Sequence, residues 1–479
     1  MKKCIPLLLF LFLNFSAISQ EWSELVNVSN MEGIDYFPDF CIDNNNVIHC
    51  VWSHKVNNDQ IIVYYAKSTD DGMNWSSPEN ISFNGDVWCL HPHIVSDSQN
   101  HLFVTYDYDT GSTSQSLVFL KMFDGNSWSN ADTVSEGMPG AFKNTMNIDY
   151  SNRVYCFWYN GALTGYFYYR YFENGIWSQT LCPYSGNNHI VVLETVIDPF
   201  NNVHCLGALH IGLNYDEQAS YFMFDNENNI WSDICEVSGK SSGMDAGIDI
   251  DIINYPHITW RQKTYLTGPN NDSTMYRFFD GNTWKEPELI VEDPYNQKLQ
   301  ITNNKVYILN WEKGDPLNNI VIYEQNNSGN WIGEIVISVE IMVPEKLLSQ
   351  DFTHHLLLYG IIEDNNYEIY YMNKEIDTTT QILHENFSLD KVNITPNPFR
   401  NATSISFTIL KPDFISLNIF DLAGRHVTTL MNEFKIPGNY NLLWDGNDIN
   451  GNVVNSGLYL VRLQCGRNIL TRSVECLKK

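Results

Sequence analysis

Five histidines break an otherwise repeating pattern in this chain, and they are its best candidates for acid–base chemistry. An imidazole could remove the C5 proton of a uronic acid or hydrogen-bond to sugar hydroxyls, or it could be an ordinary hydrogen-bonded loop residue. His91 and His93 follow Trp88, so two imidazoles are expected beside an aromatic platform. The five are His54, His91, His93, His189 and His210.

A wider set of polar and aromatic residues falls in the same non-repeating segments. Paired carboxylates are too common in so acidic a chain to identify a glycosidase pair. The sequence has no Cys and His spacing typical of zinc, no phosphate-binding loop and no dinucleotide fingerprint, so we expect no metal and no cofactor. The candidate ligand-binding set is Trp88, His91, His93, Tyr108, His189, Glu194, His210, Arg261 and Trp311.

Repeated units must position these side chains. Tryptophan recurs at steps of 53, 53, 49, 54, 53 and 47 residues, a period that indicates one supersecondary unit repeated in space. A residue found at the same place in several units is expected to hold the fold, so His49, His204 and His257 are predicted to be structural. The periodic tryptophans are Trp22, Trp75, Trp128, Trp177, Trp231, Trp284 and Trp331.

Each unit also carries a polar turn between two strands, beginning in most units with Asp. A third strand follows, and the tryptophan opens a fourth. The turns begin at residues 43, 97, 149, 198, 251, 302 and 351. Four short strands repeated seven times predict a β-propeller. The seventh unit lacks its tryptophan, so we expect the strand after Trp22 to complete it and close the ring.

The turn before Trp75 has Ser68, Asp70 and Gly72 at fixed spacing. This pattern resembles the Asp-box of the sialidase and BNR-repeat propellers. In that family the box is a structural hairpin turn on the face opposite the ligand site. The resemblance therefore implies that these four residues hold the fold and are not catalytic. It covers most of residues 21–378.

Arginine argues against sialidase activity. That family uses three arginines around the substrate carboxylate, because a forked guanidinium matches a carboxylate. Four arginines lie in the predicted propeller, and Arg153, Arg170 and Arg277 fall at positions predicted to be structural. Only Arg261 is expected at the mouth of the ring, so sialidase activity is not predicted.

The N-terminus reads as an export signal. Lys2 and Lys3 precede an apolar stretch at 5–13 and a small-x-small site at 17–19, which predicts a signal peptide over residues 1–19. No later segment is long and apolar enough to be a transmembrane segment. Nine cysteines would remain; Cys50, Cys156 and Cys205 share one repeat position and are predicted to be buried and unbonded.

The last segment, residues 392–479, has a different pattern. After a polar linker at 379–391, apolar and polar residues alternate between turns rich in Gly, Asn and Pro, which predicts a small antiparallel sandwich. Its motifs at 396–399, 417–425, 444–451 and 456–463 resemble the type IX secretion sorting domain (type A), which has a FlgD-like immunoglobulin fold. The resemblance implies recognition by secretion machinery, passage through the periplasm, and delivery to the outer cell surface or the extracellular space.

Taken together, these patterns predict an all-β, monomeric protein. A seven-bladed propeller over residues 20–378 is followed by an immunoglobulin-like sandwich. Asp and Glu exceed Lys and Arg by 56 to 28, and the net charge of −28 argues against nucleic acid as a partner. We expect non-catalytic binding of a glycan or surface protein. The alternative is a polysaccharide lyase or glycoside hydrolase, with Arg261 neutralising a uronate. The aromatic residues expected at the mouth are Tyr36, Trp88, Tyr108, Tyr159, Tyr215, Tyr265 and Trp311.

Overall fold

The fold is known from a computed structural model that describes most of residues 21–477. The predicted signal peptide and the predicted linker lie outside the described residues. The part of the chain that is described contains no helix that could cross a membrane. The undescribed segments within this span are 83–84, 86, 110, 112–114, 162–165, 185–188, 212–215, 240–241, 252, 264–271, 293, 303–304, 315–316, 327–328, 340, 351–352, 362–366, 376–391, 410–412, 422–424, 436–437, 450 and 466–467.

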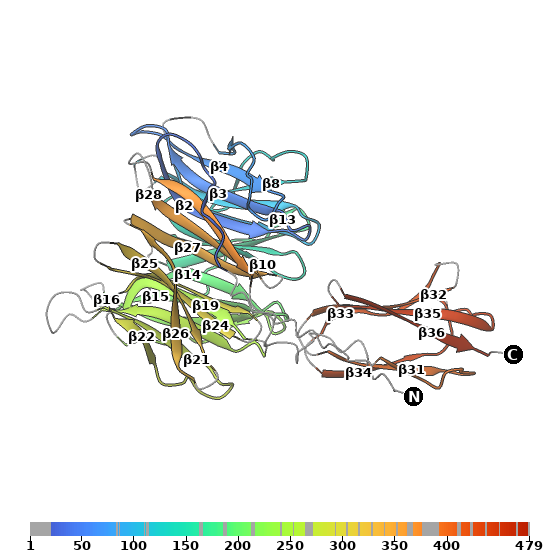
Figure 1. The fold of residues 1–479 in the computed structure, drawn as a ribbon. Coiled ribbons are helices and arrows are strands. Elements are labelled where there is room, and N and C mark those ends of the chain that lie inside the picture. The colour runs from blue at the N-terminus through green and yellow to red at the C-terminus, as the bar shows by residue number, and fades with distance from the viewer. Residues whose placement is uncertain are drawn as a thin grey trace, which may run out of the picture.

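The chain forms a seven-bladed propeller and a separate β-sandwich (Figure 1). Each blade is an antiparallel sheet whose strands run from the central channel outward. Blades 1 and 2 join into one sheet because Ile61 and Trp88 form a parallel bridge. β18 (Cys235–Glu236) is an extra strand in blade 4.

The strands of each blade are as follows, from the channel outward. Blade 1 contains β2 (Ile34–Ile42), β3 (Ile48–Lys55), β4 (Ile61–Ser68) and β5 (Glu79–Asn80). Blade 2 contains β6 (Trp88–Ser96), β7 (Leu102–Asp109), β8 (Leu117–Phe123) and β9 (Asp132–Thr133). Blade 3 contains β10 (Ala141–Ile148), β11 (Val154–Asn160), β12 (Tyr166–Glu173) and β13 (Ile176–Trp177). Blade 4 contains β14 (His189–Ile197), β15 (Val203–Ile211), β16 (Asp216–Asp225) and β17 (Ile230–Trp231). Blade 5 contains β19 (Ser242–Ile250), β20 (Pro256–Gln262), β21 (Ser273–Phe278) and β22 (Glu288–Glu292). Blade 6 contains β23 (Pro294–Thr302), β24 (Lys305–Glu312), β25 (Asn318–Gln325) and β26 (Trp331–Val339). Blade 7 contains β27 (Ile341–Gln350), β28 (Thr353–Ile361), β29 (Glu368–Glu375) and β1 (Val26–Asn27).

The seventh blade combines the two ends of the propeller. β1 pairs antiparallel with β29, and Val26 lies opposite Tyr371. Backbone hydrogen bonds extend this pairing on both sides, from Ser23 N to Asn373 O at 2.7 Å and from Val28 N to Ile369 O at 2.8 Å. The N-terminal segment therefore supplies the outermost strand of this blade.

Tryptophans of the repeat pack edge-on against a tyrosine of the preceding blade. The ring of Trp284 lies 5.4 Å from Tyr221, and that of Trp331 lies 5.1 Å from Tyr276. Edge-to-face contacts of this kind favour one relative orientation of the two rings. Further examples are Trp75 on Tyr371, Trp128 on Tyr65 and Trp231 on Tyr169.

A hydrogen-bond relay holds these tyrosines in place. His257 Nδ1 meets Tyr276 Oη at 2.6 Å, and the same contact joins His204 to Tyr221 and His49 to Tyr65, each at 2.8 Å. On its other side, His204 Nε2 lies 3.4 Å from an oxygen of Asp198, the residue that begins the turn. The relay shows that these three histidines are structural, as their shared repeat position predicts.

The turn at 68–75 connects blade 1 to blade 7. Gly72 N and Asp70 Oδ1 both bond to Ser68 Oγ at 2.9 Å, and the indole of Trp75 donates to Gly72 O at 3.1 Å. Gly72 has φ +84, and a Cβ there would overlap the Tyr371 ring. All four residues of the box are thus used in the turn or in the contact between blades.

Residues 393–476 form two facing sheets. One holds β30 (Asn393–Thr395), β31 (Thr403–Ile409) and β34 (Gly438–Trp444), and the other holds β33 (His426–Lys435), β32 (Asp413–Asp421), β35 (Gly457–Cys465) and β36 (Asn468–Cys476). The buried ring of Trp444 packs on Phe399 at 5.2 Å between the two sheets. The eight cysteines whose side chains are described form no disulfide bonds, and Cys50, Cys156 and Cys205 are among them.

The relay predicts a specific loss of stability in Tyr276→Phe. This change removes the hydroxyl that pairs with buried His257, and leaving a buried polar group unpaired costs about 1–3 kcal/mol. The control Tyr150→Phe alters a residue that is 56% exposed, so its effect should stay within about 0.5 kcal/mol. Denaturant unfolding measures both. Equal stability of the two variants would contradict a structural role for the relay.

Candidate ligand site at the channel mouth

The seven inner strands enclose a central cavity of about 540 Å³. One end of this channel is its mouth, where the chain enters the inner strands and where the second and third strands of each blade connect. The opposite end, here called the turn face, carries the Asp-started turns. Titratable residues that line the cavity are Asp39, His91, His93, Glu194, Asp249, Lys298, Glu345 and Lys346.

Asp39 braces three blades against one another inside this channel. Its carboxylate accepts from Lys346 Nζ of blade 7 at 2.6 Å and from Ile94 N of blade 2 at 3.0 Å. His93 Nδ1 lies 3.4 Å away. Burial alone would raise the pKa of Asp39, but the Lys346 ammonium and His93 hold that pKa well below its usual range. His93 therefore faces an internal ion pair.

Glu194 and Asp249 also connect neighbouring blades inside the channel. Glu194 Oε2 accepts from Ile248 N at 3.1 Å, and Asp249 Oδ2 accepts from Ile301 N at 2.6 Å. Each contact crosses from one blade to the next. Burial raises the pKa of Glu194, and it raises the pKa of Asp249 to about 7. Glu194 therefore links blade 4 to blade 5 from inside the cavity that it lines, and its predicted ligand contact stays a prediction.

A bulge interrupts every inner strand near the mouth. A bulge places two residues opposite one and so redirects side chains. In blades 1 to 3 the bulged residues are Phe37, His91 and Lys143, with φ of 49°, 48° and 53°. Left-handed backbone is unfavourable for such side chains, and its recurrence at one repeat position shows that the bulge is part of the blade fold, whereas the side chain that stands on it differs from blade to blade. The register shifts lie at Tyr36/Asp39, Leu90/His93, Phe142/Thr145, Val192/Glu194, Ser242/Ala246, Tyr295/Gln297 and Pro344/Lys346.

Phe37 and His91 form an aromatic pair at the mouth. Their ring centroids are 4.2 Å apart, and both residues line the cavity. Phe37 is 40% exposed although it is a large apolar side chain. Trp88 begins the same strand as His91, is 36% exposed, and donates its indole N–H to Asn58 O at 3.3 Å. The mouth thus presents aromatic surface that the fold does not bury.

A buried carboxylate orients His91. Its Nδ1 lies 3.0 Å from Asp107 Oδ2, and Asp107 is 3% exposed. Asp107 also accepts from Lys143 N at 2.9 Å and from Asn144 Nδ2 at 2.8 Å. A carboxylate on Nδ1 favours the tautomer that leaves Nε2 as an acceptor. The His91 side chain is 38% exposed, so that nitrogen can meet a ligand.

The other predicted histidines do not join this cluster. His54 is buried, with its Nδ1 2.7 Å from Asp35. His189 is exposed on blade 4, opposite His210 in the β14–β15 pairing, with its ring 5.9 Å from Tyr166. The His210 side chain, like Tyr215 and Tyr265, lies outside the described part of the structure.

Three further residues predicted to contact a ligand also pack against the protein, and their ligand contacts stay predictions. Arg261 is predicted to neutralise a uronate, but its Nε lies 2.7 Å from Asp272 Oδ2, which already occupies the guanidinium. Trp311 packs, partly buried, on the apolar core between blades 6 and 7. Tyr108 is partly buried against Phe119, at 5.4 Å.

Sequence reasoning did not single out Phe37 or Lys143, whereas it placed Asp107 among the carboxylates of the predicted site face. The signal for Phe37 was present, because Pro38 and Pro92 stand at one repeat position directly after Phe37 and His91. Proline cannot donate to the ladder, so within a sheet it stands at an edge or a bulge.

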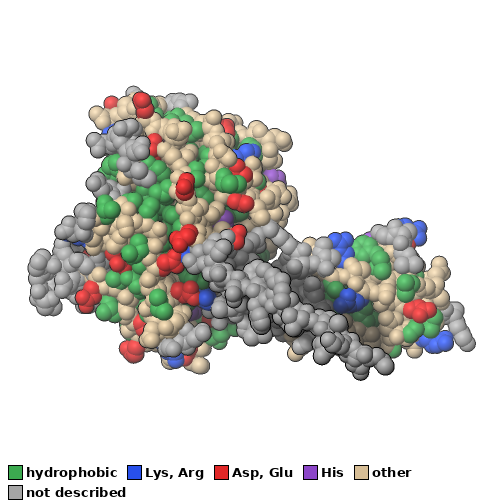
Figure 2. All heavy atoms as spheres, in the orientation of Figure 1, with side chains coloured by type: hydrophobic (Ala, Val, Ile, Leu, Met, Phe, Trp, Pro, Cys, Tyr) green, Lys and Arg blue, Asp and Glu red, His purple; other side chains and the backbone are tan. Residues whose placement is uncertain are grey.

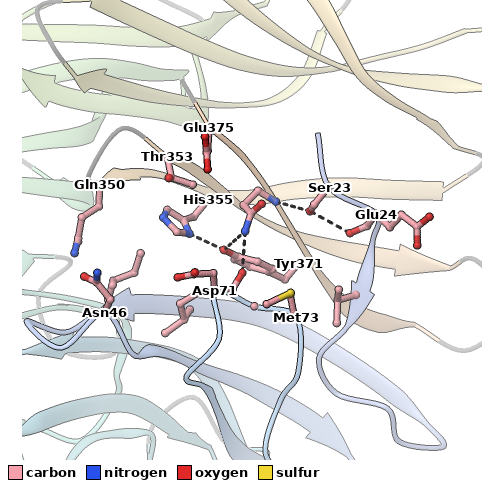
Figure 3. Close-up of a pocket in the computed structure, with 15 residues that line it drawn as sticks. Ser23, Glu24, Asn46, Asp71, Met73, Gln350, Thr353, His355, Tyr371 and Glu375 are labelled. Carbon is pink, nitrogen blue, oxygen red and sulfur yellow. Dashed lines mark hydrogen bonds between the residues drawn. The ribbon is translucent and has the colours of Figure 1, made fainter. Parts of the chain in front are cut away.

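A second cavity, of about 580 Å³, lies between blades 7 and 1 (Figure 3). Tyr371 stands in it with its hydroxyl 2.6 Å from His355 Nδ1, and Asn373 Nδ2 donates to Asp71 O at 2.8 Å. β29 and β1 are far apart in the chain, so no hairpin turn joins them and the groove beside them stays open. This cavity follows from how the ring is closed.

Comparison with known proteins identifies the family of the C-terminal sandwich. Residues 393–474 match the family described as the secretion system C-terminal sorting domain. The C-terminal sandwich is a type IX sorting domain. It indicates export to the cell surface or the extracellular space, and implies interaction with the secretion machinery.

Similarity to one solved structure supports the propeller fold, and a second similar structure is given beside it. An ulvan lyase, described as a new family of polysaccharide lyase (PL25) and bound to -[GlcA(1-4)Rha3S]-, has a TM-score of 0.55 at 10% identity, covering 72% of this chain and 95% of that one. A protein of unknown function from Dyadobacter fermentans has a TM-score of 0.49 at 13% identity, covering 75% and 100%. No curated protein matches the chain.

The raised pKa of Asp249 predicts a pH-dependent loss of stability. Because its folded pKa lies above the unfolded value, Asp249 stabilises the fold at low pH, and this contribution is lost as pH rises toward about 7. Relative to Asp249→Asn, the wild-type protein should lose up to about 1.4 kcal/mol of unfolding free energy per pH unit across this range. Denaturant unfolding from about pH 5 to about pH 8 measures the difference.

Asp225→Asn is the control for this titration. Hydrogen bonds from Asn228 lower the pKa of this exposed carboxyl, so its contribution is lost only at acid pH and is constant above about pH 5. A wild-type difference from Asp249→Asn that is equally constant would show that Asp249 does not titrate in this window.

Proposed function

We propose that this exported propeller binds a glycan at the channel mouth without cleaving it. The proposal is carried by the Phe37–His91 pair, two bulky side chains held in left-handed backbone and left exposed. Such strain must be offset by surrounding structure, and no packing need explains an exposed phenylalanine there. Sugar recognition does, because pyranose faces stack on aromatic rings while hydroxyls need oriented polar groups.

The supporting geometry combines both kinds of contact. Phe37 and Trp88 offer apolar surface, and His91 offers an oriented nitrogen beside it. Asp107 bonds to the His91 imidazole and Asn144 donates to the His91 carbonyl oxygen, so little side-chain freedom remains to be lost on binding. A preorganised, partly aromatic concavity favours a ligand over a purely structural mouth.

Truncating the exposed rings of Phe37 and Trp88 should remove most of this binding. Phe37→Ala and Trp88→Ala are each expected to weaken glycan affinity about tenfold, because a central aromatic contact contributes more than about 1 kcal/mol. The control is Phe200→Ala, which removes a 53% exposed phenylalanine from the turn face. A glycan array followed by calorimetry on the best binder measures the effect. Equal affinity of all three variants, or capture of a protein but no glycan, would overturn the proposal.

A second candidate, a polysaccharide lyase, is favoured by one observation. The buried Asp107 carboxylate on Nδ1 leaves Nε2 of the partly exposed His91 side chain as an acceptor, and removal of a C5 proton requires such a base. The similar ulvan lyase has a uronate in its bound repeat. Arg261 argues against a lyase, because the guanidinium that would neutralise a uronate is already paired with Asp272.

Lyase activity makes its own prediction. The product is an unsaturated uronate, whose ultraviolet absorbance should rise with time on uronate polymers and be lost in His91→Gln. The matched control is His101→Gln, which changes a second His–Asp pair, with similar exposure, at the turn face. If no absorbance develops while glycan binding is present, the first function holds. If lyase activity is present and is lost in His91→Gln but not in His101→Gln, the lyase function replaces non-catalytic binding.

A further inference from the structure

The Phe37–His91 pair belongs to a longer row of aromatic rings at the channel mouth. From Phe37, whose ring centroid lies 4.2 Å from that of His91, the row continues to Tyr36 at 5.9 Å. The Tyr36 ring lies 6.4 Å from that of Tyr359, and Tyr359 stacks on Tyr367 at 5.3 Å with an interplanar angle of 24°. These five residues, here called the aromatic track, cross from blade 2 through blade 1 to blade 7.

Every member of the track stands at the mouth. Tyr36 and Phe37 are at the bulge of β2, and His91 is at the bulge of β6. Tyr359 is near the end of β28 and Tyr367 directly precedes β29, so both lie where the second and third strands of blade 7 connect. The rings of the three tyrosines are half-buried, and those of Phe37 and His91 are more exposed.

The blade fold does not require aromatic rings at these places. In a regular strand neighbouring side chains point to opposite faces, whereas the bulge brings the rings of Tyr36 and Phe37 together. Positions that vary between blades can be specialised for a ligand without altering the fold. The residue directly before the bulge in blades 1 to 4 is Tyr36, Leu90, Phe142 and Val192.

The three blades that carry the track are connected to one another inside the channel. Asp39 follows Phe37 by two residues in β2, farther from the mouth. Its carboxylate accepts hydrogen bonds from Lys346 of blade 7 and from Ile94 of blade 2. Blades 7, 1 and 2 are therefore held in one relative position, and the rings form a preorganised surface. An extended ligand can bind there with little further ordering of the protein.

Contiguity distinguishes the track from other apolar surface of the molecule. Figure 2 shows hydrophobic side chains reaching the surface at many separate places on the visible face. Scattered apolar residues are normal on a folded protein, whereas a contiguous apolar patch marks an interaction site. Tyrosine suits a sugar chain, because its ring offers an apolar face and its hydroxyl can form hydrogen bonds.

We infer that the glycan binds as an extended chain of several sugars lying along the aromatic track. This inference deepens the proposed function and rests on it. The track continues over three blades, with successive ring centroids between 4.2 and 6.4 Å apart. A single terminal sugar on the Phe37–His91 pair would leave the tyrosines of blade 7 uncovered. The mouth therefore recognises a linear segment of a polysaccharide instead of a chain end.

The test measures affinity against chain length by calorimetry on the full mature chain. The probes are oligosaccharides from the disaccharide to the hexasaccharide, prepared from β-glucan, xylan, arabinan, mannan and polygalacturonate. In a series that binds, affinity should rise at least about tenfold from the disaccharide to the hexasaccharide, because each added sugar covers further rings.

Variants locate the chain on the track. Tyr359→Ala and Tyr367→Ala should each lower hexasaccharide affinity about tenfold and leave disaccharide affinity within about twofold. Phe37→Ala should lower both affinities, because the shortest probe is held at the Phe37–His91 pair. Tyr150→Ala is the matched control, since it removes a 56% exposed tyrosine from the turn face, and it should change neither affinity. Denaturant unfolding of each variant separates a lost contact from a lost fold.

Three results would overturn the inference. Affinity that is complete at the disaccharide and is lowered only by Phe37→Ala would show that the mouth binds a chain end. Affinity that rises with length but is unchanged in Tyr359→Ala and Tyr367→Ala would place the chain elsewhere on the mouth. In both cases the proposed function stands and only the inference fails, whereas binding of no probe in any series removes both.

Discussion

The contact between a periodic tryptophan and the tyrosine of the preceding blade is the constraint on which the propeller depends. A single four-stranded sheet has apolar residues on both faces and cannot bury them alone, so each blade requires its neighbours. The Trp–Tyr contact sets the angle between neighbours, and the Asp–His–Tyr relay fixes the tyrosine. The relay begins at the Asp-started turns, at the end of the ring opposite the mouth, while Asp107 connects blades 2 and 3 beside the mouth.

The channel imposes a second constraint. Seven inner strands converge on a narrow space, and polar side chains that point into it must satisfy one another. Asp39, Glu194 and Asp249 do so by accepting hydrogen bonds from adjacent blades. The titratable groups of the channel thus stabilise the ring, and ligand recognition is left to the bulged residues above them. This division explains why Glu194 and His93, which the sequence analysis places in non-repeating segments, have structural partners.

How much was predictable follows the same division. The repeat predicted the number of blades, their strands and the structural histidines, because a period reports contacts that every unit makes. It did not predict the Phe37–His91 pair, whose backbone departs from regular strand geometry. Nor did it predict that Asp272 binds Arg261, since pairing across a hairpin depends on register, which spacing does not give. The prolines after Phe37 and His91 were the one available clue.

The two ends of the propeller meet in blade 7, and this closure affects the order in which the protein folds. Asn27 donates to Glu368 at 2.6 Å across 341 residues of sequence. The entropy of closing so large a loop grows only logarithmically with length, so the closing strand need not be strongly stabilising by itself. Contacts this distant form late, however, because they reward folding only after the intervening blades exist. The ring is therefore expected to close last, at the seam where Tyr371, Trp75 and β1 meet.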